Sequence, residues 1–142
     1  MKTIMIGIDP GTHTGIAIWN QTEHKLEMVE TTTITQALDY VANKRMRAAL
    51  YNNEEIIIYF EDARKRNWFG FSGREKLQGA GSVKRDCAIW ETFCEEHGIE
   101  CRKIAPKNNT TKLSAAQFRI LTHWGGRTSE HSRDAAMLVY GR

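Results

Sequence analysis

The sequence has little of what marks a secreted or membrane-bound protein. Only three of its 142 residues are cysteine, an odd number in no disulfide-framework pattern, which fits a reducing compartment. No stretch approaches the roughly 20 consecutive apolar residues of a membrane span. The apolar run after Met1 and Lys2 is too short for a secretory signal. We therefore expect a cytoplasmic protein with no membrane partner.

Internal repeats and low-complexity tracts are also absent from the sequence. The hydrophobic content of 41% and the charged content of 26% are ordinary for a globular protein. A length of 142 residues is close to the commonest domain size. We expect one domain spanning residues 1–142.

The net charge is only +3, but its distribution is uneven. Residues 64–85 hold seven Lys or Arg against one Glu, and residues 102–119 hold five with no acid. Residues 86–101 between them carry five acids and no Lys or Arg. The basic segments are suited to contacts with phosphates, and solvated protein surface is the alternative interpretation.

The most informative stretch is the first predicted strand and the turn that ends it. Thr3–Ile8 is short and rich in Ile, which is typical of a strand covered on both faces, and Pro10 and Gly11 then turn the chain. Asp9 lies at the junction, where burying a carboxylate is costly unless a cation neutralises it. A turn aspartate that accepts backbone hydrogen bonds is the simpler alternative.

The remaining patterns predict an α/β fold with a mixed five-stranded sheet, three antiparallel plus two parallel strands, flanked by helices. A strand that follows a helix is expected to run parallel to the first strand through a crossover connection. The expected elements are strands at Gly15–Trp19, Leu26–Thr33, Glu55–Phe60 and Ile99–Ala105, helices at Ile34–Leu50, Ser82–His97, Thr111–Trp124 and Ser129–Tyr140, and a mobile loop at Ala63–Gly81.

Acidic residues recur where these elements end. Glu61 follows the second Ile-rich strand, so it should lie at the same sheet edge as Asp9, and His131 and Asp134 share one face of the last helix. Three converging carboxylates would repel one another strongly. Divalent metal resolves this conflict, and two Mg²⁺ or Mn²⁺ ions bound by oxygen ligands could clamp a phosphodiester.

Three motifs together resemble those of RuvC-type Holliday junction resolvases of the RNase H-like superfamily, particularly the shorter phage-type members. They are Ile6-Gly7-Ile8-Asp9-Pro10-Gly11, the Ile run ending in Glu61, and His131-x-x-Asp134-Ala135. The resemblance covers essentially the whole chain. It implies an RNase H-like fold, metal binding by Asp9, Glu61 and Asp134, and His131 in the place of a fourth carboxylate.

The same resemblance implies a metal-dependent crossover junction endodeoxyribonuclease, usually a homodimer, that cuts four-way and other branched DNA without a small-molecule cofactor. If a phage encodes the chain, it would act in the host cytoplasm. The family's assisting lysine cannot be placed by a motif match. Lys112 and then Lys107 are the candidates from their position between the last strand and the next helix, and ordinary solvated lysines are the alternative. Such a lysine would offset charge that builds on the phosphate.

The basic segment after Glu61 offers candidate DNA contacts. Its aromatic residues could stack on unpaired bases, at about 1–3 kcal/mol per base, while its basic residues hold phosphates. Packing of these aromatics in the core is the alternative. The candidates are Arg64, Lys65, Arg66, Trp68, Phe69, Phe71, Arg74, Lys76, Lys84 and Lys107.

The cysteines invite a zinc interpretation together with His97. The seven-residue spacing of Cys87 and Cys94 instead places them on one helical stripe with Trp90, which favours packing in the core.

Three other functions compete with junction cleavage. The turn at 7–12 resembles the phosphate loop of actin-like ATPases and sugar kinases, which need two such lobes around the nucleotide. A ribosomal-RNA-processing nuclease of the same superfamily would share the metal site. A non-catalytic branched-DNA-binding module is the third, and the acidic set argues against it, because acids near phosphate weaken binding unless metal is present.

Overall fold

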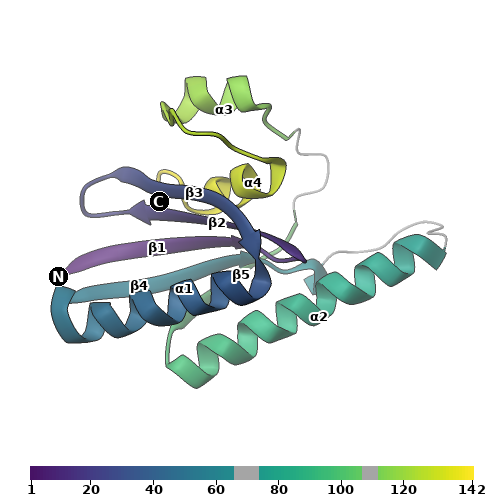
Figure 1. The fold of residues 1–142 in the computed structure, drawn as a ribbon, viewed down its shortest axis with the longest axis horizontal. Helices are drawn as coiled ribbons and strands as arrows, with labels where there is room; N and C mark the ends of the chain where they lie inside the picture. Colours follow the sequence, from purple (N-terminus) through teal and green to yellow (C-terminus); the bar gives the residue numbers. More distant parts are fainter. Residues whose placement is uncertain (66–73, 107–111) are drawn as a thin grey trace.

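The protein forms one mixed sheet with helices on both faces (Figure 1). A computed structural model describes residues 1–65, 74–106 and 112–142. The strands lie in the order β3-β2-β1-β4-β5. Their bounds are β1 Lys2–Asp9, β2 His13–Asn20, β3 Lys25–Thr33, β4 Glu54–Glu61 and β5 Glu100–Ile104.

Strand directions agree with the predicted mixture of antiparallel and parallel pairing. β1 pairs with β2, and β2 with β3, in antiparallel register. β4 pairs in parallel with β1 on one side and with β5 on the other. The crossover helices between the parallel strands make this arrangement possible.

Alternation along β1 divides the core into two layers. Ile4, Ile6 and Ile8 point into a cluster with α1 (Ile34–Arg47) and α2 (Arg74–His97). Met5 belongs to a second cluster on the opposite face, which contains residues of α3 (Ala115–Thr122) and α4 (Glu130–Val139). Because successive side chains of a strand face opposite sides, a strand buried on both faces is apolar throughout.

The first helix matches its predicted position. Thr33 caps α1 through a capping box with Gln36. The helix buries Ala37 and Val41 against the sheet, and it passes into a single π-helical turn at Ala48–Asn52. Asn53, with φ of 50°, then reverses the chain into β4.

The predicted loop at Ala63–Gly81 is wrong for part of its length. A short 3₁₀ turn occupies Ala63–Lys65, and α2 begins at Arg74 instead of Ser82. Once a helix has formed, each further residue adds a hydrogen bond, so glycines next to good helix formers can be included in it. The helix ends at His97, and Gly98 follows with φ of 62° as predicted. Residues 66–73 lie outside the described residues.

The predicted helix at Thr111–Trp124 is shorter in the structure. α3 spans Ala115–Thr122, and its cap is Ser114, which forms a capping box with Gln117. His123, with φ of 59°, ends the helix one residue before the predicted end at Trp124. No helix in the described parts of the chain is both long enough and apolar enough to span a membrane.

Candidate active site

The carboxyl ends of β1 and β4 bring Asp9 and Glu61 to one edge of the sheet. Ile8 pairs with Phe60 in the parallel register, and each acid is the next residue of its strand. The side chain of Asp9 is only 16% exposed. The sequence-based prediction of a shared edge is therefore confirmed by the register.

Two glycines allow α4 to lie directly on the sheet beside this edge. A Cβ atom at Gly15 of β2 would overlap the backbone carbonyl of His131, and one at Gly7 of β1 would overlap that of Ala135. Any larger residue at either position would push the helix away from the strands. The close approach is what places His131 and Asp134 above the end of β1.

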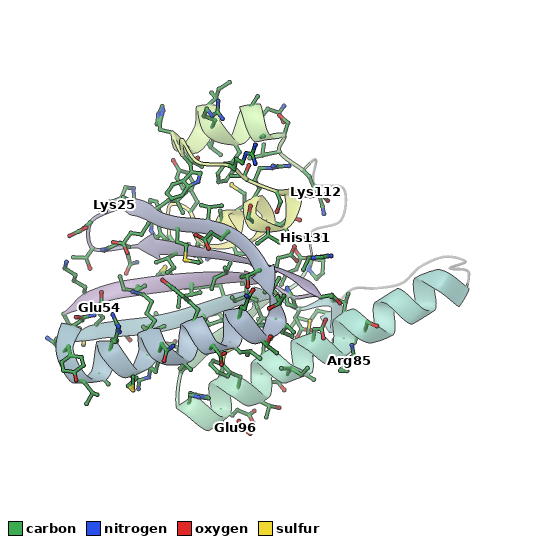
Figure 2. All side chains as sticks on the ribbon, in the orientation of Figure 1. Lys25, Glu54, Arg85, Glu96, Lys112 and His131 are labelled. Carbon is green, nitrogen blue, oxygen red and sulfur yellow. The ribbon has the colours of Figure 1, made fainter. Side chains whose placement is uncertain are left out.

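The first turn of α4 carries the histidine to Asp9. Ser129 caps the helix and accepts a hydrogen bond from the amide of Ser132. His131 Nδ1 then lies 3.0 Å from Oδ2 of Asp9. Figure 2 shows His131 on α4, on the same side of the molecule as Lys112.

Burial and neighbouring acids raise the pKa of Asp9 to about 6. Desolvation is the largest cause, and the charges of Asp134 and Glu61 add to it. The hydrogen bond from His131 acts in the opposite direction but does not compensate. The charges of all three acids therefore influence one another.

Lys112 lies at the edge of the same cluster. Its Nζ is 3.0 Å from Oδ2 of Asp134 and 2.6 Å from Oε1 of Glu130. These two carboxylates raise the pKa of Lys112, with the bond to Glu130 as the largest cause. Of the two candidate lysines, the structure places Lys112 beside the acids. Lys107 lies outside the described residues.

The donor atoms of this cluster suit a hard divalent cation. Carboxylate oxygens are the ligands that Mg²⁺ and Mn²⁺ prefer, and a cation at Asp9 would remove the penalty that raises its pKa. Within residues 1–65, 74–106 and 112–142, no three His, Cys, Asp or Glu side chains are close enough together to hold an ion. The proximity of Glu61 and Asp134 to Asp9 is expressed instead in the charges with which both raise the pKa of Asp9.

Two predicted DNA contacts, Arg64 and Lys65, are exposed but bonded to other groups of the protein. The guanidinium of Arg64 is bonded to both oxygens of Asp62 and lies 2.9 Å from Glu91. Lys65 donates to the backbone carbonyl of Lys103. A phosphate contact by Arg64 would have to replace bonds within the protein, so it stays a prediction.

The other predicted DNA contacts are distributed between α2 and undescribed parts of the chain. Lys84 is exposed on α2, and Arg74 and Lys76 belong to the start of that helix. Arg66, Trp68, Phe69 and Phe71 lie outside the described residues, so base stacking by the aromatics stays a prediction.

The cysteine stripe of α2 is a core feature, as its spacing predicted. Cys87 and Cys94 are buried together with Trp90. The thiol of Cys87 donates to the backbone carbonyl of Glu61 at 3.6 Å, and burial raises the pKa of this thiol to about 11. The helix thus supports the end of β4 from behind.

Sequence reasoning missed one residue of the cluster and underused another. Glu130 was not singled out, although it lies four residues before Asp134 and must share its helix face. His13 follows the Pro-Gly turn and is exposed, and its ring stacks beside that of His131 with centroids 6.4 Å apart.

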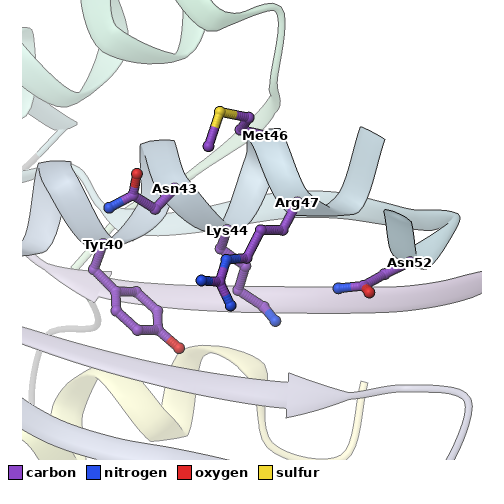
Figure 3. Close-up of a pocket in the computed structure, with 6 residues that line it drawn as sticks. All are labelled: Tyr40, Asn43, Lys44, Met46, Arg47 and Asn52. Carbon is purple, nitrogen blue, oxygen red and sulfur yellow. The ribbon is translucent and has the colours of Figure 1, made fainter. Parts of the chain in front are cut away.

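Two hollows of the described surface lie away from the acids. One of about 470 Å³ is lined by α1 and the turn after it, and Figure 3 shows the residues of its lining, which are Tyr40, Asn43, Lys44, Met46, Arg47 and Asn52. Another, of about 390 Å³, lies between α1 and α2 near Leu38 and Ile89.

Comparison with known proteins supports the fold at the level of structure. No protein-family model and no curated protein matches the sequence. Among solved structures, that of T. thermophilus RuvC in complex with Holliday junction substrate is similar, with a TM-score of 0.54 at 16% identity, over 95% of this chain and 89% of that chain. A Ppx/GppA family member from Aquifex aeolicus has a TM-score of 0.37 at 13% identity, over 75% of this chain and 35% of its own, and is too distant to carry an argument. The chain therefore has the RNase H-like fold of RuvC.

Proposed function

We propose that the protein is a metal-dependent endodeoxyribonuclease that cuts four-way and other branched DNA junctions. The observation that carries the proposal is the position of Asp9. It is nearly buried at the end of β1, on a RuvC-like fold, and its pKa is raised by burial and by Asp134 and Glu61. A largely buried acid whose pKa stays raised although His131 bonds to it is typical of a functional site, and a cation there would stabilise its charged form.

In this proposal Asp9, Glu61 and Asp134 hold one or two Mg²⁺ or Mn²⁺ ions, with His131 as a further ligand. When bound, a divalent cation would make water a better nucleophile and offset charge on the scissile phosphate. The chain's own contribution is the placement of its oxygen donors. β1 and β4 fix two of them by register, and α4 brings the third across Gly15.

His131 and Lys112 have separate roles in the proposed chemistry. The hydrogen bond to Asp9 fixes the orientation of the His131 ring. The ammonium of Lys112, which lies 3.0 Å from Asp134, would stabilise the negative charge that develops on the phosphate oxygens in the transition state.

DNA would approach the edge of the sheet that carries these acids. Uneven charge favours this approach, because the basic segment 64–85 follows the end of β4 closely in sequence and the basic segment 102–119 contains the candidate lysine. The name of the T. thermophilus structure states that it contains Holliday junction substrate. By that analogy we propose branched DNA as the substrate. We propose a homodimer as the active form because the three sequence motifs resemble those of RuvC-type resolvases, which are usually homodimers.

Cleavage assays on defined substrates test the proposal. Four-way, three-way and linear duplex DNA and a branched RNA of matched sequence would be incubated with the protein and Mg²⁺ or Mn²⁺, and cuts mapped at nucleotide resolution. We expect nicks near the branch point of DNA junctions that require metal and vanish in Asp9→Asn. Preferential cutting of RNA would favour the processing nuclease, and metal-independent junction binding without any cut would favour the binding module.

A further inference from the structure

Lys112 stands between two carboxylates of the same helix face. Glu130 and Asp134 are four residues apart on α4, so they project side by side. The Nζ atom of Lys112 is 2.6 Å from Glu130 and 3.0 Å from Asp134. The two carboxylates therefore share the ammonium. The closer one belongs to Glu130, which is not among the proposed metal ligands.

The two ion pairs differ in their surroundings. The side chain of Asp134 is 23% exposed, whereas those of Glu130 and Lys112 are each 59% exposed. An exposed ion pair contributes little to folding. The bond to Glu130 instead affects the position of the Lys112 ammonium. This position is important because the ammonium and a divalent cation would compete for the same oxygens of Asp134.

We propose that Glu130 is a positioning residue, which holds the ammonium of Lys112 at the edge of the site when a divalent cation occupies Asp134. This inference rests on the proposed function, since it takes Asp134 as a metal ligand. With Glu130 present, Lys112 gives up one of two carboxylates on metal binding and stays beside the substrate phosphate. Without it, the lysine either competes with the cation for Asp134 or leaves for solvent.

Manganese binding to the DNA-free protein tests this without measuring activity. The free Mn²⁺ signal in electron paramagnetic resonance would be followed for the wild type, Glu130→Gln, Lys112→Met and the double variant. We expect Glu130→Gln to weaken Mn²⁺ affinity about fivefold when Lys112 is present and less than twofold in the Lys112→Met background. The loss should depend on the lysine, because competition by its ammonium is the cause.

A matched control removes a comparable ion pair elsewhere. Glu100 on β5 is an exposed carboxylate 2.6 Å from Arg102, so Glu100→Gln should leave Mn²⁺ affinity unchanged. Equal weakening by Glu130→Gln in both backgrounds would mean a general charge effect and would overturn the inference alone. Wild-type Mn²⁺ binding that is absent, or that Asp134→Asn does not change, would overturn the proposed metal site and this inference with it.

Discussion

The contact between Gly15 and α4 makes a prediction that depends on geometry alone. In Gly15→Ala, the new methyl group would overlap the carbonyl of His131, which is backbone and cannot rotate away. β2 cannot retreat either, because Gly15 pairs with Asp9 on one side and with Thr31 on the other. The start of α4 must therefore move away from the sheet.

The size of the effect follows from ordinary contact distances. A carbon and a carbonyl oxygen approach to about 3.3 Å, so the helix must shift on the order of 1 Å. Overpacking of this kind costs about 1–3 kcal/mol, and the lost freedom of the unfolded glycine returns at most about 1 kcal/mol. We expect a net loss of about 1–2 kcal/mol, or roughly 3–7 °C in melting temperature for a domain of this size. The 3.0 Å contact between His131 and Asp9 should be lost as well.

Thermal unfolding followed by circular dichroism and junction nicking with Mg²⁺ would measure both consequences. Gly125→Ala is the matched control, because a methyl group at that position would meet open space. It should melt no lower than the wild type and cut normally. A Gly15→Ala protein with wild-type melting temperature and nicking would refute the argument that this glycine sets the distance between α4 and the strands.

Four further predictions concern side chains of the proposed metal site and of the basic segment after Glu61. Asp9→Asn should abolish nicking yet keep junction binding in a gel-shift assay, and a fully active variant would remove Asp9 from the metal site. Burial raises the pKa of Asp9 to about 6 in the folded state, so ionisation of Asp9 lowers the folding stability as pH rises from about 4 through 6. Without metal, Asp9→Asn should therefore be more stable than the wild type at pH 8, by up to about 3 kcal/mol. Thermal melts at pH 3 should show no difference between the two proteins. His131→Asp should still nick, with preference shifted toward Mg²⁺, whereas inactivity with either metal would show that the imidazole does more than ligate. Trp68→Ala combined with Phe69→Ala should reduce discrimination of branched from linear duplex more than total affinity, and competition binding that finds unchanged discrimination would retire base stacking.

Much of the fold could be predicted from the sequence because its signals are local. The Ile-rich runs before Asp9 and Glu61 mark buried strands, and the helix between them requires a parallel crossover. The shared sheet edge of the two acids follows directly. Helix boundaries were less predictable, because α2 extends to Arg74 through glycines that usually interrupt helices, and Ser114 rather than an upstream threonine caps α3.

The arrangement of the site was harder to predict because it depends on contacts between distant segments. Gly15 gives no sign in the sequence that α4 will lie on it, and no local pattern indicates that Lys112 will reach Asp134, 22 residues further along the chain. The ion pairs of Arg64 were likewise invisible, since Glu91 lies 27 residues away. Charge counts indicated where basic residues are concentrated in the sequence, but not which of them form ion pairs within the protein.

The central claim is that acids from β1, β4 and α4 share bound divalent cations. A crystal soaked in Mn²⁺ and measured at the manganese absorption edge tests it most directly. The account predicts anomalous density beside Asp9 that contacts Glu61 or Asp134, and its loss in Asp9→Asn crystals. Density elsewhere on the molecule, with none at this edge of the sheet, would contradict it.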